Sequence, residues 1–206
     1  MKTDDYFLAA LRTAPIDDPS NTANQVTRLE YLELLENGTT MAKGKTATLD
    51  VWHGILGIAG EASELLELFE KAEVRPDKDA LVKEIGDIWW YVAPLVRGLH
   101  GSAEKEFKRI ADAAVERAND LNHGVISLAT NRITEPMKKW IWYGKQINLK
   151  ELEDAVVELL AVTIFVADMA DVTIEEVLDA NIAKLKARYP ERFDEAAAVA
   201  KADERA

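Results

Sequence analysis

Apolar residues recur at intervals of three and four along most of the chain, and no segment shows the strict alternation that is typical of a half-buried strand. This spacing places apolar side chains on one face of a helix, so it predicts an all-α fold, an antiparallel helical bundle. The composition agrees, because Ala, Leu, Glu and Lys are strong helix formers and are abundant here. The chain has 206 residues, of which 48% are hydrophobic, and we expect one domain over residues 1–206.

Helix-breaking residues divide this pattern. Asn37-Gly38, Pro76-Asp77 and Tyr189-Pro190 are typical helix ends, and Pro94 should kink or end the helix in which it lies. We expect a polar loop over residues 39–46 and a frayed helix over residues 194–206. The expected helices cover about residues 4–13, 24–36, 48–73, 78–98, 103–121, 124–145, 149–170 and 173–187.

The charge of the chain limits its partners. A net charge of −12 repels nucleic-acid polymers and anionic membranes, although metal ions could still bridge the protein to a small phosphorylated ligand. There is no cysteine, which excludes disulfides and Cys-based zinc sites. No stretch approaches about 18 uncharged apolar residues, and the first residues do not resemble a secretory signal. We therefore expect a cytoplasmic protein that does not bind membranes.

Two pairs of acids are spaced for metal binding. Glu61 and Glu64 are three residues apart, as are Glu84 and Asp87, so each pair lies on one face of its helix. If the two helices pack antiparallel, the four carboxylates converge. Such oxygen-rich sites suit Mg²⁺, with Mn²⁺ as the alternative.

The surroundings favour this interpretation over an ordinary solvated face. Glu84 and Asp87 are the only charged residues between Lys83 and Arg97, and unpaired carboxylates on an apolar face are costly. A di-iron site would need Glu-x-x-His pairs, which these acids do not form. His53 precedes Glu61 by eight residues, about 12 Å along a helix, and can either contact a substrate or play a structural part.

The chain also shows a suspected internal repeat. Residues 50–59 align with residues 120–129, and residues 82–93 align with residues 156–167, so that Glu84 meets Glu158. The other three acids are not repeated, and the aligned residues are Asn131, Thr134 and Ala161. We expect a catalytic half at about residues 24–99, a degenerate repeat at about 103–170 and a C-terminal helix at about 173–187.

These motifs resemble the all-α nucleoside triphosphate pyrophosphatases, and the MazG-like branch best, a superfamily that also includes the dimeric dUTPases and dCTPases. The resemblance covers about residues 48–99 and 173–193 and lies in residues 60–65, residues 84–87 with Tyr91, and the late segment 181–190. The sequence departs from a compact MazG-like domain in the 75 or so residues between these blocks, which contain the suspected repeat.

The resemblance implies a metal-dependent enzyme that hydrolyses a nucleoside triphosphate to the monophosphate and pyrophosphate. It implies a homo-oligomer, either dimer or tetramer. It makes Glu61, Glu64, Glu84 and Asp87 the metal ligands and catalytic acids, and it gives Asn181 and Lys184 a role at the triphosphate. From their positions we expect His53, Tyr91 and Arg188 to bind the substrate as well. The alternatives are a dUTP- or dCTP-specific pyrophosphatase and a catalytically silent bundle that binds a nucleotide or a protein. For Asn181 and Lys184, an ordinary charged helix end is also an open interpretation.

Overall fold

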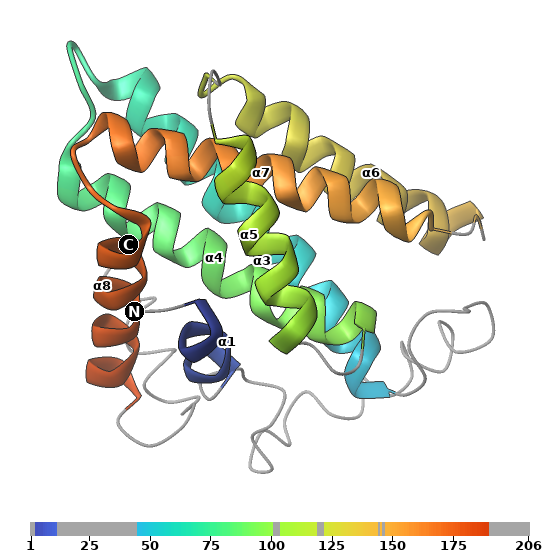
Figure 1. Cartoon of the computed structure of the whole chain (residues 1–206). Coiled ribbons are helices and arrows are strands. Elements are labelled where there is room, and N and C mark those ends of the chain that lie inside the picture. Colours follow the sequence, from blue (N-terminus) through green and yellow to red (C-terminus); the bar gives the residue numbers. More distant parts are fainter. Residues whose placement is uncertain are drawn as a thin grey trace.

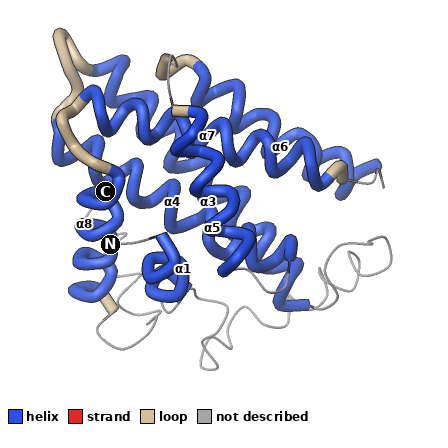
Figure 2. The backbone as a smooth tube through the Cα atoms, in the orientation of Figure 1, coloured by secondary structure: helices blue, strands red, loops and turns tan. Residues whose placement is uncertain are grey.

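The computed structural model describes residues 3–11, 45–100, 104–118, 122–143, 145 and 147–189. Within these ranges all regular structure is helical and no strand occurs, which confirms the expected all-α fold (Figure 2). The seven helices are α1 (Thr3–Leu11), α3 (Lys45–Lys71), α4 (Lys78–His100), α5 (Glu104–Arg117), α6 (Val125–Tyr143), α7 (Leu149–Met169) and α8 (Ile174–Arg188).

The helices α3 and α4 form an antiparallel hairpin. Residues at increasing distance from the connecting turn on α3 contact residues at increasing distance from it on α4, so the two helices run antiparallel. In order from the turn, the contacts are Glu61 with Glu84 and Asp87, Gly57 with Tyr91, Gly54 with Leu95, and Asp50 with Arg97.

The helix α4 is the centre of the bundle. It packs against α1, α3, α5, α7 and α8, and most of its residues from Glu84 to Leu99 are buried. Trp89 is fully buried, and its indole N–H donates to Thr163 Oγ1 on α7 at 3.0 Å. Because α4 touches several other helices, functional groups on it can meet side chains from distant parts of the chain.

The remaining helices surround this hairpin (Figure 1). The helices α6 and α7 lie side by side, α5 packs on α7, and α6 contacts α3. On another side of α4, α1 and α8 pack against it and against each other. A capping box begins α8, in which the Thr173 side chain accepts from the Glu176 N–H and the Glu176 carboxylate accepts from the Thr173 N–H.

Some sequence expectations are corrected and others fall outside the described residues. Pro94 does not end its helix, since α4 continues to His100; the ring lies in the buried core, where tertiary packing compensates for the lost backbone donor. The breaks at Pro76-Asp77 and after Tyr189 are confirmed. The expected helix at 24–36, most of the loop at 39–46 and the tail at 194–206 lie outside the described residues.

Among the described helices, none has the length and apolar character needed to cross a membrane.

Candidate metal centre

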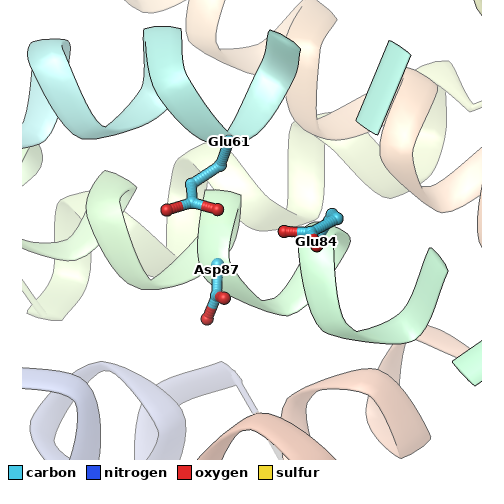
Figure 3. Close-up of side chains that lie close together, drawn as sticks. All are labelled: Glu61, Glu84 and Asp87. Atoms are coloured by element: carbon cyan, nitrogen blue, oxygen red, sulfur yellow. The ribbon is translucent and has the colours of Figure 1, made fainter. Parts of the chain in front are cut away.

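Three carboxylates from the central hairpin converge. Glu61 reaches from α3 toward α4, which carries Glu84 and Asp87 one turn apart (Figure 3). One oxygen from each of the three side chains lies within 4.8 Å of the others. Glu84 and Asp87 are buried and Glu61 is half-buried. In the part of the chain that the structure describes, no other group of acids or histidines is arranged in this way.

Two of these carboxylates retain oxygens that have no hydrogen-bond partner. Glu61 Oε2 and Glu84 Oε2 are both buried and unpaired. A buried charged oxygen without a partner is costly, so the arrangement needs a cation or a proton. The donor set consists of carboxylate oxygens alone, which fits a hard divalent cation such as Mg²⁺ or Mn²⁺.

Asp87 is held by two side chains from α8. Asn181 Nδ2 donates to Asp87 Oδ1 at 2.9 Å, and Lys184 Nζ donates to the same oxygen. The two donors are three residues apart and therefore lie on one face of α8. In Figure 3, Asp87 points to the side of α4 on which α1 and α8 lie. Asn181 and Lys184, which were expected to bind the triphosphate, thus lie beside the acidic site, and their role in substrate binding stays a prediction.

The charges of the site nearly balance without a metal ion. Lys83 Nζ donates to Glu84 Oε1 at 2.5 Å, so Lys83 and Lys184 each neutralise one carboxylate. Burial above all, and next the charge of Asp87, raises the pKa of the Glu61 carboxyl from 4.5 to about 8. The charge of Glu64 adds to this, as do a hydrogen bond with the Glu84 side chain and the charge of Glu84. At pH 7 the metal-free site therefore holds a proton on Glu61 and two ion pairs.

Glu64 differs from the other three acids. Its side chain is exposed on α3, and it is not part of the group within 4.8 Å. Its charge nevertheless acts on Glu61. The expected quartet is therefore a buried triad with a fourth acid near its exposed side.

The other expected substrate-binding residues, His53, Tyr91 and Arg188, make contacts outside the triad. Tyr91 lies one turn after Asp87, and its ring packs over Gly57. His53 is half-buried and makes edge contacts with Trp90 and Tyr91, with ring centroids 5.3 and 5.1 Å apart. Arg188 lies over the ring of Tyr189, with 5.7 Å between its Cζ and the centroid.

Most of the tryptophans belong to the core. Trp89 and Trp140 are buried, and Trp52 and Trp90 are partly buried against the same core. The side chain of Trp142 lies outside the described residues. Lys138 and Lys139, which could also have faced phosphates, pair with Glu135 on their own helix.

Sequence reasoning missed two residues that belong to this site. Lys83 directly precedes Glu84, and its position beside the isolated acid was a usable signal. Tyr6 hydrogen-bonds to Asn181 Oδ1 at 3.0 Å from the other end of the chain, and no local pattern indicates such a contact.

The α6–α7 pair has no comparable acidic centre among its described residues. Glu158, which aligns with Glu84, accepts from Arg132 on α6, and Ala161 is buried where Asp87 would stand. An internal ion pair thus occupies the position in which the first hairpin has its carboxylates. That the two hairpins arose by duplication stays a prediction.

Comparisons of the chain with protein-family models, with curated proteins and with solved structures found no match. The likeness to the all-α nucleoside triphosphate pyrophosphatases therefore depends on the sequence motifs alone.

Proposed function

We propose that the protein hydrolyses a nucleoside triphosphate, or its deoxy form, to the nucleoside monophosphate and pyrophosphate with the aid of Mg²⁺ or Mn²⁺. The observation that carries the proposal is the convergence of three carboxylates in the bundle, with one oxygen each of Glu61, Glu84 and Asp87 within 4.8 Å of the others. Such a group suits a divalent cation, and the surrounding motifs are those of the pyrophosphatase superfamily.

The reaction needs a water molecule and charge neutralisation. Water adds to the α-phosphorus, and the bond between that phosphorus and the oxygen that bridges to the β-phosphorus breaks, so pyrophosphate leaves. A bound divalent cation supplies positive charge to the phosphate oxygens and lowers the pKa of water. Glu61, Glu84 and Asp87 would hold the cation. Glu64, exposed beside them, is placed either to complete the ligand set or to accept the proton of the attacking water.

In this proposal the two lysines of the site also bind the phosphates of the substrate. Lys83 and Lys184 both line a groove of about 290 Å³ between α4 and α8, whose other walls include Asn181 and Val82. Once a cation replaces them at Glu84 and Asp87, their ammonium groups can donate to phosphate oxygens. The groove thus offers positive donors directly beside the carboxylates.

A panel of nucleotides tests this function. The protein is incubated with each NTP and dNTP and with Mg²⁺ or Mn²⁺, and monophosphate, pyrophosphate and orthophosphate are measured separately. We expect metal-dependent release of pyrophosphate and monophosphate in equal amounts. Turnover of dUTP or dCTP alone would favour the narrower specialist, and orthophosphate as the first product would contradict the proposed bond cleavage. If no nucleotide is turned over with either metal, the chain is not such an enzyme.

Variants assign the activity to the triad. Glu61→Gln and Asp87→Asn should each abolish turnover while the helical circular-dichroism signal stays unchanged. Glu70→Gln is the matched control, because Glu70 is an exposed acid on the same helix as Glu61. Full activity in Glu61→Gln or Asp87→Asn would show that the carboxylates are not the metal site.

The proposal extends to assembly and location. The resemblance implies a homo-oligomer, dimer or tetramer, whose partner is the nucleotide. The net charge of −12 argues against binding to a nucleic-acid polymer or a membrane, and the expected location is the cytoplasm. Light scattering coupled to size-exclusion chromatography measures the assembly, and a monomeric mass would contradict this part of the proposal.

A further inference from the structure

Tyr6, near the beginning of the chain, is connected to the carboxylate triad through Asn181. Its phenol ring is fully buried, and its hydroxyl donates to Asn181 Oδ1 at 3.0 Å and lies 3.2 Å from the carbonyl oxygen of Gly86. Asn181 then donates through Nδ2 to Asp87 Oδ1 at 2.9 Å. This chain of hydrogen bonds joins α1, α8 and α4.

The Asp87 carboxylate and the Tyr6 hydroxyl together favour one orientation of the Asn181 amide. A primary amide has an accepting oxygen and a donating nitrogen, whereas a carboxylate can only accept. When Tyr6 donates to the amide oxygen, the NH₂ group is directed to Asp87. The reversed amide would bring its oxygen against the carboxylate, and the Tyr6 hydroxyl would then donate only to the Gly86 carbonyl oxygen, 3.2 Å away.

The side chain of Asn181 also packs closely against the backbone of α4. A Cβ atom at position 86 would lie 2.8 Å from Asn181 Cβ and 3.0 Å from Nδ2, so only glycine fits beside this side chain on α4. Asn181 itself is 3% exposed. Because the backbone of α4 confines Asn181, the amide has few orientations other than the two related by a flip.

We propose that Tyr6 is a positioning residue of the metal centre: its hydroxyl helps to hold Asn181, which in turn fixes the orientation of the Asp87 carboxylate. The role of the cation rests on the proposed function, whereas the chain of hydrogen bonds does not. Groups that orient a metal-ligating carboxylate typically change metal affinity by about 10- to 100-fold when they are removed. The helix α1 thus contributes to the site through Tyr6, which reaches Asp87 by way of Asn181.

A structural role in packing is the competing explanation, and two variants separate the two roles. Tyr6 and Phe7 both pack against Phe107, with ring centroids 6.3 and 5.2 Å away. Tyr6→Phe keeps the ring and removes only the hydroxyl. Phe7→Leu disturbs the packing on Phe107 and leaves the hydrogen bonds intact, so it is the matched control.

The first measurement is the dissociation constant of Mn²⁺, by titration calorimetry on the full chain. Tyr6→Phe should weaken binding about tenfold, Asn181→Ala should do so at least as much, and the double variant should bind no more weakly than Asn181→Ala alone. Phe7→Leu should bind like the wild type. Unchanged affinity in Tyr6→Phe, or additive losses in the double variant, would overturn the proposal.

The second measurement needs no metal ion. Hydrogen exchange of the Asn181 side-chain NH₂ group, followed by ¹⁵N NMR and assigned by its absence in Asn181→Ala, should be faster in Tyr6→Phe than in the wild type and Phe7→Leu. Equal exchange rates would show that Tyr6 does not hold the amide. A wild type that binds no Mn²⁺ would contradict the proposed function instead, and the exchange rates would still decide the role of Tyr6.

Discussion

The ring of Tyr91 lies directly against the backbone of Gly57, where α3 and α4 make a close contact. A Cβ atom at position 57 would lie 2.0 Å from Tyr91 Cδ1, which is far inside van der Waals contact. Gly57 therefore permits the close approach of the two helices that carry the triad.

Gly57→Ala should destabilise the protein, because the methyl group must displace the Tyr91 ring or separate the helices. Overpacking typically costs about 1–3 kcal/mol, and the better helix propensity of Ala returns up to about 1 kcal/mol. We expect a net loss of about 1–2 kcal/mol in the free energy of unfolding. Urea denaturation followed by circular dichroism measures it.

Gly60→Ala is the control for this change. A Cβ atom at position 60 meets no atom within 4 Å, so the substitution should be neutral or stabilise the protein by up to about 1 kcal/mol. Equal stabilities for the two alanine variants would contradict the close contact at Gly57.

Arg97 and Asp50 join the far ends of the same two helices. Arg97 Nε and Nη2 donate to the two oxygens of Asp50 at 2.5 and 2.7 Å, and Asp50 is 1% exposed. Arg97→Met should lower the free energy of unfolding by about 3–5 kcal/mol, because it leaves a buried charge without its partner. The exposed pair Lys108–Asp112 is the comparison, and Lys108→Met should cost about 0–1 kcal/mol. Similar losses in both variants would show that the Asp50 pair is not buried.

The raised pKa of Glu61 predicts how stability depends on pH in the absence of metal. The folded protein keeps the Glu61 proton up to about pH 8, whereas the unfolded chain loses it near 4.5. Between these values the folded state binds more protons, so its stability falls as the pH rises. Urea denaturation in EDTA should show this decline from pH 5 to 9, with a smaller decline in Glu61→Gln than in Glu70→Gln. The same pH dependence in both variants would contradict the raised pKa.

Lys184 should affect metal binding and catalysis in opposite directions. It pairs with Asp87 in the metal-free protein, so it competes with an incoming cation for that carboxylate. Two unit charges about 4 Å apart interact with on the order of 1–4 kcal/mol near a protein surface. Lys184→Met should therefore bind Mn²⁺ roughly tenfold more tightly, while kcat/KM for the nucleotide falls. Lys186→Met, on the exposed face of α8, is the control and should change neither. Weaker Mn²⁺ binding in Lys184→Met would contradict the competition.

Local sequence patterns were sufficient to predict most of the fold and the centre of the site. The spacing within residues 48–73 and 78–98 indicated the two long helices, and the isolated charges of Glu84 and Asp87 on an apolar face indicated a buried acidic site. These features depend on neighbours along one helix, which is why they can be read from the sequence.

The features that were missed depend on contacts between distant segments. Tyr6 reaches Asn181 across 175 positions, and Arg97 reaches Asp50 across 47. Pro94 was expected to kink or end its helix because its local effect is unfavourable, yet the burial of the surrounding residues of α4 carries the helix past it to His100. Tertiary packing determines these contacts and whether a helix continues past a proline, and a single sequence does not show that packing.

The central claim is that Glu61, Glu84 and Asp87 together hold a divalent cation, and direct Mn²⁺ binding tests it most simply. Electron paramagnetic resonance measures free Mn²⁺ as protein is added at pH 8, where the proton on Glu61 is readily displaced. The account predicts saturable binding by the wild type and by Glu70→Gln, and binding weakened by at least about tenfold in Glu61→Gln, Glu84→Gln and Asp87→Asn. Equal Mn²⁺ binding by the wild type and by all three triad variants would contradict it.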